Sequence, residues 1–159
     1  MNIVGIKHPN DKTNKMYWFK LPEENVDVSL GELLVCDTKN GWSVGQVEKI
    51  FYGLSNSEVR SIAKSQPTKK VIGRYIDKPI EKIVVPSYCT NSFPSPNKLT
   101  ERIKEYYDWR NYQSFEMFKT KVLFDSDNVL KDGYTAYLVA KMFGRRSLYG
   151  CMLFERKSI

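Results

Sequence analysis

The chain of 159 residues contains one histidine, three cysteines and no long apolar run. The single histidine, His8, is the only possible base for a His-based nucleophilic triad, and its neighbour Pro9 predicts an exposed turn instead. Cys36, Cys89 and Cys151 are widely spaced and form no CxxC pair, which predicts reduced thiols and no closed zinc site. Neither GxxxxGKS/T nor GxGxxG occurs, so phosphate-binding loops of those two kinds are absent.

No segment approaches the ~18 consecutive apolar residues that a membrane-spanning helix needs. The first ten residues also lack the long apolar stretch of a signal peptide. We therefore expect a soluble, cytoplasmic protein with no membrane partner. Its length suits one domain or two small modules that share a core.

Positive charge is present in excess and is unevenly distributed. The net charge is +7, and residues 60–82 carry seven basic and two acidic residues. Residues 141–157 carry five basic residues and one acidic residue. Charge concentrated in two segments favours an anionic partner, although a soluble basic protein also displays solvated basic surfaces without any such task.

The first fifty residues predict four strands in meander order. Short apolar or aromatic runs at 2–6 and 16–21 precede residues 30–50, which predict a hairpin. Asn40 and Gly41 form its turn, because both turn positions need a positive φ that these residues accept. Gly45 predicts a bulge or a close approach of another chain segment.

The sequence after residue 50 predicts both helices and strands. A short helix is expected over 56–64 with Asn56 or Ser57 as its cap, followed by strands over 71–76 and 80–85. Prolines and small polar residues mark a linker near 88–98. The spacing of apolar residues beyond it predicts one long helix over 99–122, or two helices with a break near 112–114. Residues 128–154 fit a helix, with Gly144 at the position after its end, but a hairpin and a last strand serve equally.

These elements predict an α+β protein: an N-terminal SH3-like antiparallel β-barrel with an appended aromatic-rich, mainly helical C-terminal half. The expected domains are a barrel-like domain over 1–87, a linker over 88–98 and a mainly helical region over 99–159. Because aromatic residues supply much of the burial in a small domain, the aromatic stripe of the 99–122 helix is expected to be mostly core.

The opening of the chain resembles the start of the PSP1 family of bacterial proteins. The matching features are a first strand ending in Val4-Gly5, an aromatic strand, Gly31-Glu32, Asp37-Thr38 and Gly45-Gln46-Val47. The glycine and valine rhythm is also similar to KOW and other SH3-like barrels, and the resemblance covers residues 2–50. It implies a barrel-like half with a non-enzymatic binding role, as an adaptor or a nucleic-acid-associated module.

Carboxylates offer a route to metal-dependent catalysis. Asp125, Asp127 and Asp132 lie close together in sequence, and a metal-dependent nuclease would use such a group. The same residues also suit a turn and a helix cap, because their side-chain oxygens accept hydrogen bonds from free N–H groups. No catalytic residue, metal ligand or cofactor is assigned, and the nuclease is kept as a third hypothesis.

Surface recognition is the leading expectation. The first hypothesis is a non-enzymatic nucleic-acid-binding module of phage or bacterial origin, in which basic side chains of segments 60–82 and 141–157 contact phosphates. Its candidate residues are Lys69, Lys70, Arg74, Arg145 and Arg146. The alternative is a phage-encoded inhibitor or adaptor that binds a host nucleic-acid-handling enzyme through Trp42, Trp109 and Arg110, since tryptophan and arginine are common at binding hot spots.

Overall fold

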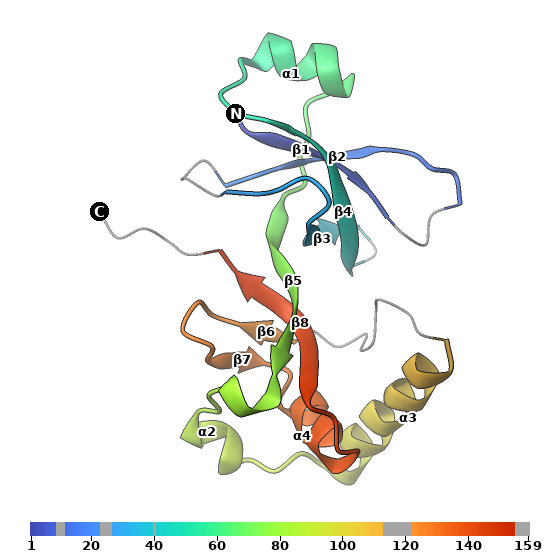
Figure 1. Cartoon of the computed structure of the whole chain (residues 1–159), viewed down its shortest axis with the longest axis vertical. Helices are drawn as coiled ribbons and strands as arrows, with labels where there is room; N and C mark the ends of the chain where they lie inside the picture. The colour runs from blue at the N-terminus through green and yellow to red at the C-terminus, as the bar shows by residue number, and fades with distance from the viewer. Residues whose placement is uncertain (9–11, 23–26, 40, 113–121, 155–159) are drawn as a thin grey trace. The chain divides into compact units, whose positions relative to one another are not determined.

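The computed structural model describes residues 1–8, 12–22, 27–39, 41–112 and 122–154, with the backbone alone for 108–112. The strands in these ranges are β1 (Ile3–Lys7), β2 (Tyr17–Lys20), β3 (Leu33–Thr38), β4 (Gly41–Phe51), β5 (Val71–Pro79), β6 (Leu123–Phe124), β7 (Leu130–Asp132) and β8 (Ser147–Leu153). The helices are α1 (Asn56–Ala63), α2 (Ser87–Thr90), α3 (Pro96–Tyr112) and α4 (Tyr134–Met142), with a single 3-10 turn, η1 (Ile80–Lys82) (Figure 1).

These strands form one mixed sheet in the order β2-β1-β4-β3-β5-β8-β6-β7. Three of them, β6, β7 and β8, come from the half of the chain that was expected to be mainly helical, and β6 pairs with β8 in parallel. The predicted SH3-like antiparallel barrel with an appended helical half is therefore wrong. The reason is that short apolar runs in this half fit a helix and a strand equally well, and pairing of β8 with β5 and β6, and of β6 with β7, decides for the strand.

The four strands predicted within residues 1–50 all form, but their meander order is wrong. β1 lies between β2 and β4, since Val4 pairs with both Phe19 and Ile50. The β3–β4 hairpin is confirmed: Thr38 pairs with Gly41, whose φ is +105°. Asn40 lies outside the described residues. β4 is eleven residues long and pairs with both neighbours. Its first half, residues 41–46, pairs with β3, and its second half, residues 46–51, pairs with β1.

Two compact units divide the chain, one made of residues 1–74 and 154–159 and the other of residues 75–153. β5 belongs to both, because its first four residues lie in the first unit and the rest in the second. The domain boundaries predicted from the sequence, at residues 87 and 98, separate parts that would fold independently. The two compact units do not test independent folding, so these boundaries stay a prediction.

The first unit has its own apolar core. Its buried members are Val4, Ile6, Phe19, Leu21, Val28, Leu34, Cys36, Val47 and Val71. The predicted helix at 56–64 is confirmed as α1, and Val59 is its buried residue. Its cap is Ser55, which precedes both predicted cap positions, Asn56 and Ser57. The Ser55 hydroxyl accepts from the Glu58 amide, and the Glu58 carboxylate accepts from the Ser55 amide.

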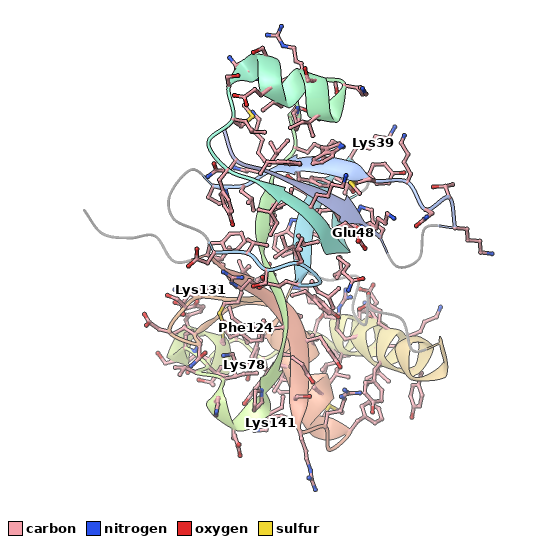
Figure 2. The ribbon with its side chains drawn as sticks, turned by 45° about the horizontal axis from the view of Figure 1, so that its top comes forward. Lys39, Glu48, Lys78, Phe124, Lys131 and Lys141 are labelled. Carbon is pink, nitrogen blue, oxygen red and sulfur yellow. The ribbon has the colours of Figure 1, made fainter. Side chains whose placement is uncertain are left out.

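The second unit is built around a separate core. Its buried members are Ile83, Val122, Phe124, Leu130, Ala136, Ala140 and Leu148. Figure 2 labels Phe124, which is fully buried. The strand predicted over 80–85 is wrong, because η1 occupies its first half and only Val84 makes a β-bridge, to Val129. Pro79 and Pro86 flank this segment and cannot donate to a sheet ladder.

Residues 128–154 combine the two alternatives that the sequence left open. β7 ends at Asp132, Gly133 has a φ of +96°, and α4 follows before β8. The predicted helix end is confirmed, because Gly144 has a φ of +68° and the Arg145 amide donates to the Ala140 carbonyl.

The predicted linker contains α2 and the beginning of α3. This long helix begins at Pro96, three residues before the predicted start. The Ser95 hydroxyl accepts from the Lys98 amide, and proline suits the first helical position because its missing N–H needs no partner there. The predicted break near 112–114 lies mainly outside the described residues.

Candidate nucleic-acid interface

Backbone hydrogen bonds bring Lys69 and Lys70 next to Lys20 in the first unit. The Lys20 amide donates to the Lys69 carbonyl at 2.9 Å, and Lys20 forms a parallel β-bridge with Lys70. Fifty residues separate the two bridged lysines in the sequence. The segment just before β5 therefore lies beside β2 and concentrates positive charge there.

The side chains of Lys20 and Lys70 point away from the core. Phe19, Leu21 and Val71 are core residues, and side chains alternate between the two faces of a strand. Bridged residues share a face, so the two ammonium groups extend from neighbouring positions on the outer surface. Lys70 is exposed and Lys20 is half-buried, and neither makes an ion pair with a carboxylate of the described residues.

Asp37 and Trp42 continue this line across β3 and β4. The Asp37 amide donates to the Lys70 carbonyl at 3.1 Å, and Asp37 pairs with Trp42 in the hairpin. The neighbouring Cys36 lies in the core, so Asp37 and its partner Trp42 lie on the opposite face of the sheet, where Asp37 is exposed and Trp42 is half-buried. We call these four residues, Lys20, Lys70, Asp37 and Trp42, the Lys–Trp row.

Arg74 has internal partners, unlike the two lysines. Its guanidinium forms an ion pair with the Glu32 carboxylate and donates to the Asp27 carbonyl at 2.5 Å. It also lies 5.2 Å from the centroid of the Phe154 ring. The sequence placed Arg74 among the phosphate contacts, whereas these bonds tie β5 to the segment that precedes β3.

Arg145 and Arg146 lie in the second unit, directly after α4. The loop that ends α4 positions them, and the Arg146 carbonyl accepts from the Ile80 amide at 2.9 Å. Arg146 is exposed and Arg145 is half-buried. Basic side chains near a helix C-terminus are favourable because its free carbonyls carry partial negative charge. The position of these arginines shortly after α4 is therefore one reason for positive charge here, besides contact with a phosphate.

Trp109 and Arg110 lie near the end of α3, where the backbone alone is described. The earlier part of the same helix tests part of the aromatic stripe. Tyr106 is buried and stacks on Phe143 at 4.4 Å between ring centroids, whereas Tyr107 is 47% exposed. The expectation that the stripe is mostly core is thus supported at Tyr106 and not at Tyr107.

The acidic residues that suggested a nuclease are used by turns. The Asp125 carboxylate accepts from the amides of Asp127 and Val129 at 2.9 and 3.0 Å, and Lys131 lies 3.6 Å from its other oxygen. Asp132 accepts from the Gly133 amide. The turn joins β6 to β7 and does not begin a helix. Among the described residues no group of three or more His, Cys, Asp and Glu side chains is placed to hold a metal ion.

A neighbouring basic side chain, Lys78, is likewise bound internally. Its ammonium donates to the side-chain oxygen of Asn128, which lies in the same β6–β7 turn. Asn128 itself has a φ of +67°, a conformation that asparagine tolerates better than most residues. Lys78 therefore holds the turn, and its position gives no reason to count it among phosphate contacts.

His8 is half-buried, so the prediction of an exposed turn histidine is wrong. Its Nδ1 lies 3.1 Å from the Val44 carbonyl oxygen and 3.0 Å from the Ser43 hydroxyl. Nδ1 donates to the Val44 carbonyl when it carries the ring proton, and accepts from the Ser43 hydroxyl when the proton is on Nε2. Both contacts hold the ring beside β4.

Sequence reasoning missed Lys20 and Asp37. Alternation along the aromatic strand does place Lys20 on the outer face, since Phe19 and Leu21 are apolar. That signal says nothing about which segment lies beside Lys20. Only the bridge to Lys70 makes this residue part of a charged surface.

Comparisons with protein-family models, with curated proteins and with solved structures found no match. The resemblance of residues 2–50 to the PSP1 family therefore stays a prediction. No helix in the described part of the chain is long and apolar enough to cross a membrane.

Proposed function

We propose that this protein is a cytoplasmic, non-enzymatic nucleic-acid-binding module whose main phosphate contacts are Lys20, Lys69 and Lys70. The observation that supports the proposal most is the bridge between Lys20 and Lys70. Like charges on paired positions repel one another and reduce stability. A phosphate between the two ammonium groups removes that repulsion and gains charge-assisted hydrogen bonds.

The net charge of +7 supports the same proposal. Binding to nucleic acid releases counterions from the phosphates, so affinity falls linearly on a log–log plot against salt concentration. Arg74 is left out of the proposed contacts because Glu32 and Asp27 already bind it. Arg145 and Arg146 remain candidate contacts of the second unit.

The experiment measures fluorescence polarisation of labelled oligonucleotides at several salt concentrations. The test variant carries Lys20→Gln and Lys70→Gln. We expect weaker binding and a salt slope reduced by roughly 0.7 to 0.9 for each phosphate that the variant no longer neutralises. The control carries Arg60→Gln and Lys64→Gln, which removes two exposed charges from α1 and the residue that follows it.

Equal losses in the two variants would contradict the assigned lysines, because net charge would then explain the affinity. Absence of binding at low salt would reject nucleic acid as the partner altogether. Far-ultraviolet circular dichroism of each variant shows whether the fold is kept.

A second candidate function, binding to a host protein, is favoured by one feature of the second unit. Residues 83–97 contain no charged side chain, although the protein as a whole is rich in charge. Tyr88 and Phe93 in this segment are 62% and 71% exposed. Exposed aromatic side chains are common anchors of protein interfaces.

Capture from host lysate after nuclease treatment tests this candidate. A protein that is retained by the wild type and lost with Tyr88→Ser and Phe93→Ser would support it. Asn91→Ser and Thr90→Ser in the same segment are the matched control. Retention of the same proteins by all three forms would rule out this segment as the binding site.

A further inference from the structure

The Lys–Trp row has different chemistry at its two ends. Lys20 and Lys70 provide two ammonium groups at one end, and Trp42 provides an indole ring at the other. Neighbouring strands lie about 4.8 Å apart, so the Cα atoms of Lys70 and Trp42 are separated by roughly 10 Å. Lysine side chains are long enough to reach a phosphate of the nucleotide whose base contacts the ring.

We propose that the row binds single-stranded nucleic acid in preference to duplex, with a base stacked on Trp42 and its phosphate between Lys20 and Lys70. This inference rests on the proposed function. A duplex hides the faces of its bases inside the helical stack, whereas a single strand can turn a base onto an aromatic ring. Lysines alone give no such preference, since both forms carry phosphates.

Asp37 determines which end of the Lys–Trp row receives the phosphate. Asp37 lies between Lys70 and Trp42 in the row, and its carboxylate repels phosphate, so the backbone of the nucleic acid is held toward the lysines. The same carboxylate accepts hydrogen bonds, and the amino groups of bases donate them. A stacked base with an amino edge can therefore occupy the space beside Asp37, which a phosphate cannot.

The direct test compares single-stranded DNA, single-stranded RNA and duplex DNA of one sequence at one salt concentration. We expect both single strands to bind more tightly than the duplex. Because stacking of a base on an aromatic side chain is worth about 1–3 kcal/mol, Trp42→Leu should weaken single-strand binding by roughly 5- to 150-fold. The duplex affinity should stay unchanged, and Trp42→Phe should restore most of the loss.

Intrinsic fluorescence supplies a second readout. The chain has three tryptophans, and stacking on Trp42 should quench part of their emission. The quenching should be lost in Trp42→Phe, although that variant still binds. A quenching signal that persists in this variant would contradict the stacked base.

The outcomes separate this inference from the proposed function. If no oligonucleotide binds, the proposed function fails and the inference fails with it. If binding depends on salt and on the two lysines but is equal for duplex and single strand and insensitive to Trp42→Leu, the proposed function stands and the single-strand inference is overturned. A thermal melt of Trp42→Leu and Trp42→Phe shows whether both variants are folded under the assay conditions.

Discussion

Single residues of this protein occupy positions where one added atom has a large effect. Gly45 lies in β4 opposite Leu34, and a Cβ built there would lie 2.1 Å from Cγ2 of Ile6. Ile6 is fully buried and β-branched, so its side chain cannot rotate away cheaply. The predicted close approach at Gly45 is thus confirmed, whereas the bulge of β4 lies at Glu48, between the partners of Gly5 and Ile6.

We expect Gly45→Ala to destabilise the protein by about 1–3 kcal/mol, the usual result of overpacking a core. Urea unfolding followed by circular dichroism measures this loss. Glu48→Ala is the matched control, because Glu48 is exposed on the same strand. A Gly45→Ala variant as stable as the control would show that the core has room for the extra methyl group.

Cys151 is a second position where the surroundings control the chemistry. Burial raises the pKa of its thiol to about 12, so very little of it is thiolate at pH 8. We expect a thiol reagent to leave Cys151 unmodified in the native protein and to modify the half-buried Cys89 first, as measured by peptide mass spectrometry. Rapid modification of Cys151 without denaturant would contradict its burial.

The same pKa shift predicts a loss of stability in alkali. The folded protein holds the proton of Cys151 more tightly than the unfolded chain does. The stabilisation is complete below about pH 9 and falls as the pH rises from there toward 12. Cys151→Ala should show a smaller decline over this range in unfolding measurements against pH.

Among the secondary-structure elements, α1 depends on its first turn. Two hydrogen bonds lower the pKa of the Glu58 carboxyl below its ordinary value. The bond with the Ser55 amide has the larger effect, and the bond with the Ser55 hydroxyl has the smaller one. A carboxylate with a lowered pKa stabilises the folded state at neutral pH, and this contribution is lost as the solution is acidified below about pH 4.5. The capping box therefore weakens in acid.

Ser55→Ala should cost about 0.5–2 kcal/mol of helix stability, because the Glu58 amide loses its acceptor. Hydrogen exchange of the Val59 amide, which donates to the Ser55 carbonyl, reports on this helix alone. Ser61→Ala is the control, since Ser61 is an exposed residue of the same helix. Equal exchange in both variants would mean that packing of Val59 alone holds α1.

At the scale of the whole molecule, two cores share no residue. One lies in the unit of residues 1–74 and the other in the unit of 75–153, and β5 belongs to both units. Stability need not be uniform in such a chain, because local opening follows cooperative segments with their own packing. A defect in one core should therefore act more strongly on its own unit.

Gly150→Ala tests this expectation. A Cβ at Gly150 would lie 2.6 Å from Cε2 of Phe124 and 3.0 Å from the Val122 carbonyl oxygen, which cannot move easily. Relative to the wild type, we expect Gly150→Ala to increase the rate of amide exchange more in β6, β8 and α4 than in β1 and β4. Gly45→Ala should show the reverse pattern. Uniform acceleration in both variants would show that the two units open together.

Local signals in the sequence determined the β3–β4 hairpin, α1, the end of α4 at Gly144 and the excess of positive charge. Each depends on residues a few positions apart, so turn geometry, capping and spacing are sufficient. The tertiary structure decided which strands pair, why residues 123–153 form strands as well as a helix, and which basic side chains are bound internally. These outcomes depend on segments far apart in the chain, such as Lys20 and Lys70, and short apolar runs do not specify their partners. The Lys–Trp row is therefore a product of the fold, although each of its residues is visible in the sequence.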